Sequence, residues 1–226
     1  MKHAHTFIGV AIATLSLAGA ASANTIYDNP YVLGNGGDCS FSTTCAAQAG
    51  RGDDFAAQSF TLTSAAVVTG ASFTELDFGT IPTDVNWGFA LANGPGGLPG
   101  TFLSSGTDAV SSSTVLGSDF GANVTKVFFD VGPQALGPGT YYFAIQAVSP
   151  VFDTYLGFGA ANSGAAETMD GGVTWSPGYE GGSSIAVALY GTGGGVPEPA
   201  TWALMLLGFG GIGAAVRRRE RVASAA

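Results

Sequence analysis

The residues of this sequence that could do chemistry are mostly carboxylates. Glu75 and Asp77 stand two positions apart in a stretch that reads as a strand, so their side chains share one face. Two carboxylates at a suitable separation can hydrolyse a glycosidic bond, one as the acid and the other as the nucleophile or base. Acidic pairs also commonly decorate the solvent face of a β domain, and we favour that interpretation over catalysis.

A second group of acids could bind a cation. Asp53 and Asp54 come just before an apolar strand, and Asp38 lies upstream next to a cysteine. Their oxygen atoms are the kind of ligand that Ca²⁺ prefers. The alternative is that they are solvated loop acids, because the sequence has no D-x-D-x-D-G loop. We expect no resident cofactor, and calcium stays an open alternative.

Histidine is absent from the central part of the chain, since His3 and His5 both precede residue 24. Histidine is the usual base near neutral pH and the commonest ligand of transition metals. Hydrolases of the Ser-His-Asp or Cys-His type, and zinc sites built on histidine, are therefore excluded for residues 24–195.

The charge of the same segment is strongly negative. It holds two basic residues, Arg51 and Lys126, and all of the sixteen acidic residues except Glu198 and Glu220, which gives a net charge of −12. Two cations cannot neutralise many phosphates, so we expect no nucleic-acid partner.

Aromatic side chains are the other candidate binding groups, because a flat ring suits the C–H face of a sugar. Trp175 lies in a glycine-rich loop, and an exposed tryptophan in such a loop is the best candidate, with Tyr179 beside it. Packing of these residues against the core is the alternative. Further possible platforms are Trp87, Tyr142 and Tyr155, of which Trp87 alternates with core residues and is expected to be buried.

Short alternations of apolar and polar residues predict the elements that position these groups. A period of two over four to eight residues is typical of half-buried strands. The expected strands cover residues 85–91, 127–131, 141–145 and 185–189, with further candidates at 58–63, 71–78, 101–105 and 155–158. Many short strands separated by turn residues predict a single all-β domain, an antiparallel β-sandwich or jelly roll.

The first 23 residues predict export. A basic start at Lys2 leads into an apolar stretch over 7–20, which closes with the small-x-small sequence Ala21-Ser22-Ala23. This is the pattern of a secretory signal peptide, and the apolar stretch is short for the alternative, a membrane anchor. In an exported chain, Cys39 and Cys45 are expected to form a disulfide; a redox role is the lesser alternative because their spacing is not C-x-x-C.

The C-terminal region predicts a membrane segment. Residues 201–216 carry no charge, and as a helix they would be about 24 Å long, close to the thickness of a bilayer core. The alternative is a buried C-terminal helix. Arg217, Arg218, Arg219 and Arg221 follow at once and are expected to stay cytoplasmic, with the domain on the other side of the inner membrane.

The same region resembles a known sorting signal. Val196-Pro197-Glu198-Pro199, an apolar stretch and an arginine cluster follow one another as in the PEP-CTERM family. The resemblance implies recognition by exosortase, a membrane enzyme similar to cysteine transpeptidases, and processing near the Pro-Glu-Pro of Pro197, Glu198 and Pro199. It also implies a Gram-negative bacterium that makes exopolysaccharide or biofilm matrix. The two prolines disfavour helix and favour an extended, accessible segment.

Together these features predict a signal peptide (1–23), a β-sandwich domain (24–192), a glycine-rich spacer with the Pro-Glu-Pro motif (193–200), a transmembrane sorting helix (201–216) and an arginine-rich cytoplasmic tail (217–226). The expected function is that of an exported, non-enzymatic protein of the cell surface or extracellular matrix, structural or glycan-binding. The expected partners are exosortase, extracellular polysaccharide and, transiently, the inner membrane. The alternatives are a carboxylate-dependent enzyme that acts on glycosides and a Ca²⁺-dependent adhesin.

Overall fold

The computed structural model describes residues 24–38, 41–44, 54–150, 154–179 and 184–193 of the 226-residue chain. Over these ranges the chain forms mainly strands, with a short 3₁₀ turn at Pro95–Gly97. The strands are β1 (Asn24–Asn29), β2 (Gly37–Asp38), β3 (Phe55–Leu62), β4 (Ala66–Asp77), β5 (Asp84–Leu91), β6 (Phe102–Asp119), β7 (Ala122–Leu136), β8 (Gly139–Val148), β9 (Thr154–Gly157), β10 (Ala165–Thr168), β11 (Ser176–Pro177) and β12 (Val187–Gly193).

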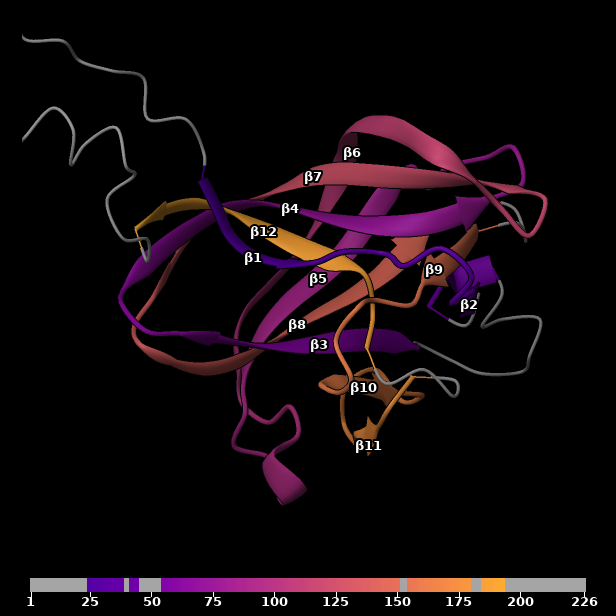
Figure 1. The fold of residues 1–226 in the computed structure, drawn as a ribbon. Coiled ribbons are helices and arrows are strands. Elements are labelled where there is room, and N and C mark those ends of the chain that lie inside the picture. Colours follow the sequence, from indigo (N-terminus) through magenta and orange to yellow (C-terminus); the bar gives the residue numbers. More distant parts are fainter. Residues whose placement is uncertain (1–23, 39–40, 45–53, 151–153, 180–183, 194–226) are drawn as a thin grey trace, which may run out of the picture.

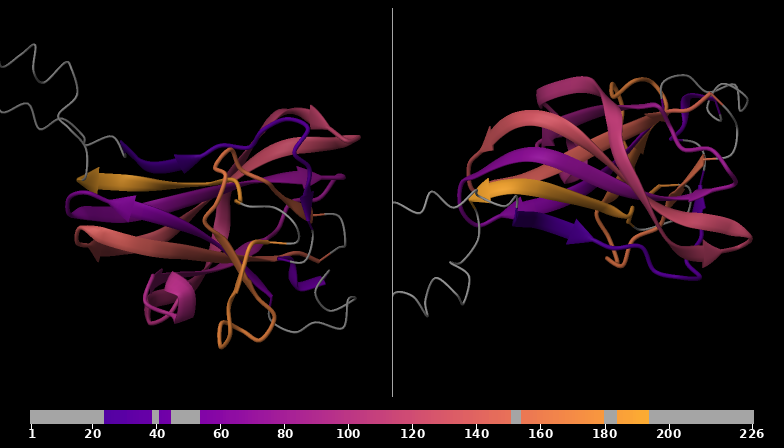
Figure 2. Two further views of the ribbon diagram at one scale, coloured as in Figure 1. Left: turned by 60° about the horizontal axis from the view of Figure 1, so that its bottom comes forward. Right: turned by 90° about the horizontal axis from the view of Figure 1, so that it is seen from above.

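The strands form one curled antiparallel sheet whose two halves face each other (Figure 1). The first half has the order β1-β12-β4-β7, with β9 and β2 added at one end of β4, and the second has the order β5-β8-β3-β10-β11. Strand β6 joins the halves, because it pairs with β5 over its first eight residues and with β7 over the rest. Figure 2 shows the two layers from two further directions.

The core lies between the two layers and is rich in phenylalanine. The ring of Phe129 on β7 lies 6.2 Å from that of Phe73 on β4 and 6.3 Å from that of Phe143 on β8, so it bridges the layers. Phe143 in turn lies 4.9 Å from Phe89 on β5. All four side chains are buried in one cluster. The prediction of an all-β, sandwich-like fold is therefore confirmed.

Most predicted strands are found, with one large difference in length. The sequence predicted a strand at 101–105, whereas β6 continues to Asp119. Within the missed part, residues 111–118 are exposed on both faces, so this stretch carries no alternation of buried apolar and exposed polar residues. The prediction at 185–189 began too early, because β12 starts at Val187 and Ile185 makes an isolated bridge to Phe158.

The outer face of the second layer is built from small residues. Ala57 on β3, Ala90 on β5, Ala144 on β8 and Ala166 on β10 are buried there together with Tyr142. A sheet with small side chains on its outer face lets other segments approach the backbone closely. The start of β6 and the β10–β11 hairpin come close to the sheet there, and they form part of the candidate site.

Candidate functional site

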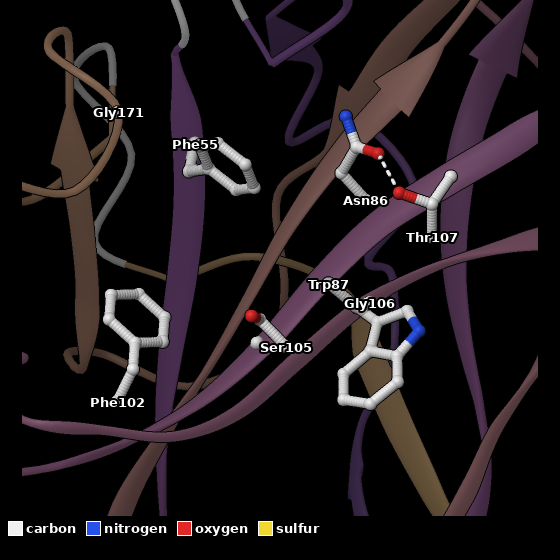
Figure 3. A pocket seen from close by; sticks show the side chains of 9 residues that line it. Phe55, Asn86, Trp87, Phe102, Ser105, Gly106, Thr107 and Gly171 are labelled. Atoms are coloured by element: carbon white, nitrogen blue, oxygen red, sulfur yellow. Dashed lines mark hydrogen bonds between the residues drawn. The ribbon is translucent and has the colours of Figure 1, made fainter.

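A pocket of about 440 Å³ lies over β5 and the first half of β6 (Figure 3). Its volume falls within the range of small-molecule sites. Its lining consists of Phe55, Asn86, Trp87, Gly88, Phe102, Ser105, Gly106, Thr107 and Gly171. These nine residues come from β3, β5, β6 and the β10–β11 loop, and none has a charged side chain.

One side of the pocket is aromatic. Figure 3 shows the rings of Phe55 and Phe102 on the same side of the pocket. Ser105 lies between these rings and the side chains of Asn86 and Thr107. Phe102 lies directly over Gly88, because a Cβ atom built at Gly88 would be only 2.5 Å from Cε1 of that ring. The ring can take this position only where the strand beneath it has no side chain.

The opposite side of the pocket is a row of hydrogen-bonded side chains across three strands. Thr107 donates its hydroxyl proton to Oδ1 of Asn86 at 2.6 Å, and Nδ2 of Asn86 donates to Oε1 of Gln146 at 2.7 Å. Gln146 is buried and donates in turn to the carbonyl oxygen of Asp54 at 3.1 Å. The three side chains face each other directly in the strand register, so the row fixes the plane of the Asn86 amide.

The β10–β11 loop that brings Gly171 to the pocket is organised around Asp170. Its carboxylate accepts hydrogen bonds from the hydroxyls of Thr168 and Thr174 and from the backbone N–H groups of Val173 and Thr174. These bonds lower the pKa of Asp170 to about 2, chiefly through the two threonine hydroxyls. At neutral pH the loop is therefore held by a charged acceptor with several donors.

Trp175, the first candidate from the sequence, lies next to Phe102 and is not part of the pocket lining. Its ring is half-buried, 6.4 Å from the ring of Phe102, and its Nε1 donates to the carbonyl oxygen of Gly172. It is absent from the lining, so it supports Phe102 and the loop.

Tyr179, the second candidate, is a core residue. Its side chain is 1 % exposed, and its hydroxyl donates to the carbonyl oxygen of Asp38 and accepts from the backbone N–H of Phe41. A ring in that position cannot stack on a sugar, so the prediction that Tyr179 binds a ligand is wrong. Its two hydrogen bonds link the end of the segment that follows β11 to Asp38 and Phe41 near the start of the domain.

The carboxylates Glu75 and Asp77 are not on a solvent face, contrary to the interpretation favoured from the sequence. Both are buried at the end of β4. Asp77 accepts from the hydroxyl of Thr125, from Nδ2 of Asn123 and from the backbone N–H of Gly79. These bonds hold the ends of β4 and β7 together, which is a structural role.

Only two of the three calcium candidates lie among the described residues. Asp38 lies on β2 and Asp54 is buried just before β3, whereas Asp53 lies outside the described residues. In the part of the chain that the structure describes, no three His, Cys, Asp or Glu residues are grouped as a metal site would require.

Of the other aromatic candidates, Trp87 borders the pocket, whereas Tyr142 and Tyr155 are not part of its lining. Trp87 is buried as expected, its Nε1 donates to Asp108, and it borders the pocket from below Gly106. Tyr142 is buried on the outer face of the second layer, and Tyr155 packs edge-on against Phe78 away from the pocket.

The sequence did not point to the residues that form the pocket. Phe55, Asn86, Phe102 and Thr107 were not among its candidates. One signal was available: Asn86, Gly88 and Ala90 are the polar and small positions of a strongly alternating strand. An outer strand face without large side chains indicates that another segment or a ligand comes close.

The cysteines and the C-terminal signal fall on other parts of the chain. Cys39, Cys45, the Pro-Glu-Pro segment and residues 201–226 all lie outside the described residues. Among the described residues, no helix has both the length and the apolar character needed to cross a membrane.

Comparison with known protein families tests the sorting signal that the C-terminal residues predict. A family model for the PEP-CTERM protein-sorting motif matches residues 195–219. The chain carries a PEP-CTERM sorting signal. This PEP-CTERM motif begins two residues after the end of β12, and it implies export, transient association with the membrane and processing by exosortase. No curated protein matches the chain.

Proposed function

We propose that this PEP-CTERM protein is a non-enzymatic component of the cell surface or extracellular matrix, and that it binds polysaccharide in the pocket over β5 and β6. The observation that carries the proposal is the composition of the lining: two phenylalanine rings face an amide and a hydroxyl that are held in place by a hydrogen-bonded row. Aromatic rings with a few fixed polar groups are typical of sites that bind neutral, partly apolar ligands.

The positions of the acids support a binding role over catalysis. General acid–base chemistry needs a titratable group within hydrogen-bond reach of the ligand. The nine lining residues offer none, and the pair Glu75 and Asp77 is buried at the end of β4, where Asp77 already accepts three hydrogen bonds. The exported location that the sorting motif implies supports polysaccharide as the ligand class.

The test is affinity electrophoresis of the purified protein in gels that contain a neutral polysaccharide, with release of reducing ends measured in parallel. We expect retardation of the wild-type protein and no new reducing ends. Phe102→Ala should abolish the retardation, because it removes the ring that covers Gly88. Leu103→Ala is the matched control, since Leu103 is exposed on the neighbouring position of the same strand.

Two results would count against the proposal. Equal retardation of the Phe102 and Leu103 variants would mean that polysaccharide binds elsewhere on the molecule. Release of reducing ends that disappears in Glu75→Gln or Asp77→Asn would establish the enzymatic alternative instead.

A further inference from the structure

We infer that the pocket selects a neutral sugar ring through two neighbouring hydroxyl groups, which Asn86 and Thr107 bind as a fixed donor–acceptor pair. The inference rests on the proposed polysaccharide-binding function and goes beyond it by assigning the chemistry of the sugar. The grounds for it are the pattern of donor and acceptor, the rigidity of that pattern, the aromatic side of the pocket, and the charge of the surroundings.

The donor–acceptor pattern follows from the hydrogen bonds that are already made. Thr107 gives its only hydroxyl proton to Asn86, so towards a ligand its oxygen is an acceptor. Asn86 uses one N–H of its amide for Gln146, and the second N–H is a donor without another partner among the described residues. A ligand must therefore present one hydroxyl that donates and an adjacent one that accepts.

The pattern is rigid because the row continues into the protein. Gln146 is 3 % exposed and binds the backbone of Asp54, so it holds the Asn86 amide from the buried side. Turning the amide over would place Nδ2 against the hydroxyl proton of Thr107 and Oδ1 against the Oε1 acceptor of Gln146. A polar pair that is already oriented loses little conformational entropy when it binds, which favours selectivity.

The aromatic side completes the fit to a sugar ring. Phe55 and Phe102 stand across the pocket from Asn86 and Thr107, with the hydroxyl of Ser105 between the two sides (Figure 3). A pyranose has an apolar C–H face and hydroxyls at its edge. One ring of this kind can place its face on the phenylalanines while two adjacent hydroxyls reach the polar pair.

The charge of the domain excludes acidic sugars. The pocket lining has no basic residue that could pair with a carboxylate or sulfate, so an anionic sugar would be desolvated without compensation. The segment from residue 24 to residue 195 carries a net charge of −12, which also repels an anionic polymer at long range. The ligand is therefore a neutral glycan with a vicinal diol.

The experiment compares three forms of each of three polysaccharides, pullulan, galactomannan and xyloglucan, in affinity electrophoresis. The forms are the native polymer, the polymer opened at its vicinal diols with periodate and reduced, and the polymer carboxylated at C6. We expect the wild-type protein to bind at least one native polymer, and to bind the opened and carboxylated forms of that polymer at least tenfold more weakly.

The residue roles are tested with Thr107→Val, which keeps the shape of the side chain and removes its oxygen. Loss of one hydrogen bond to the ligand should weaken binding of the native polymer about five- to tenfold. The matched control is Thr61→Val, which removes a hydroxyl from an exposed cross-strand pair with Thr140 in the same layer, outside the pocket lining. Equal melting temperatures of the two variants exclude a folding defect.

The outcomes separate the inference from the proposed function. Binding of native and opened polymer with equal affinity, or equal binding by Thr107→Val and Thr61→Val, overturns the inference and leaves the proposed function standing. Preference for the carboxylated form also overturns the inference. If the wild-type protein binds none of the native polymers, the proposed function fails and the inference with it.

Discussion

Two neighbouring phenylalanines on β7 give a sharp test of the layered structure. Phe129 is 1 % exposed and lies between Phe73 and Phe143, so its ring links the two halves of the sheet. Phe128 is the preceding residue and points to the outer face, where its half-buried ring lies 6.0 Å from that of Tyr190. The two positions have the same residue type and the same strand, and they differ only in the face that they occupy.

The expected cost of Phe129→Ala is large. Truncating a fully buried phenylalanine lowers the free energy of unfolding by about 3–5 kcal/mol, because transfer and cavity terms add. For a domain of this size, each kcal/mol corresponds to about 2–4 °C in melting temperature, so we expect a decrease of roughly 6–20 °C. Phe128→Ala removes a half-buried ring and its cation–π contact with Lys126, which together should cost about 1 kcal/mol, or roughly 2–4 °C.

The assay is thermal unfolding followed by circular dichroism, with urea unfolding as a second measurement. The slope of free energy against urea concentration should be the same for both variants, because neither changes the surface exposed on unfolding very much. Equal losses for Phe128→Ala and Phe129→Ala would refute the reasoning. A larger loss for Phe128→Ala would mean that the register of β7 is shifted by one residue, which exchanges the two faces.

Three further predictions concern the pocket, its loop and the core. Gly88→Ala should abolish polysaccharide binding in affinity electrophoresis with little change in melting temperature, because the new Cβ atom displaces the exposed ring of Phe102. The carboxylate of Asp170 has a pKa of about 2, below its value in an unfolded chain, so it stabilises the loop above about pH 4 and this contribution is lost as the pH falls towards 2. Fluorescence of Trp175 should report that acid transition, and Asp170→Asn should remove its pH dependence; an unchanged transition would contradict the assignment. Tyr179→Phe should lower the free energy of unfolding by about 1–3 kcal/mol, measured in urea, because it leaves the backbone N–H of Phe41 without its partner; no loss would argue against this bond.

The strands that the sequence predicted well are those with one buried face. In β5, Val85, Trp87 and Phe89 alternate with smaller or polar residues, and all three lie in the core. The second half of β6 has no buried face, so its sequence lacks the alternation on which the prediction depends. Short strands such as β10 and β11 were also missed, because two to four residues are too few to display a period.

The candidate site could be predicted only in part. Trp175 was identified from its glycine-rich loop, and it lies next to the pocket as a support for Phe102. Tyr179 comes from the same stretch and is buried, because the chain turns into the core between the two residues. Composition and spacing within a loop do not tell which of its aromatic residues faces solvent.

The sequence by itself determined the sorting of this protein and the class of its fold. A sorting motif is a linear signal, read by an enzyme from consecutive residues, so it needs no tertiary structure to be recognised. The strand class follows from alternation, which is a local property of the chain. The absence of histidine from residues 24–195 and their negative charge likewise limited the possible chemistry.

Only the tertiary structure shows the pocket in which we propose that a ligand binds. The pocket brings together Phe55, Asn86, Phe102 and Gly171, which are up to 116 positions apart in the sequence. Their proximity depends on the register of β5 with β6 and β8 and on the placement of the β10–β11 hairpin beside β3. Alternation along a strand separates two faces but does not say which face meets which neighbour. That choice is made when the sheet curls and its core face is buried, which leaves the small residues of β5 on the outside to form the floor of the site.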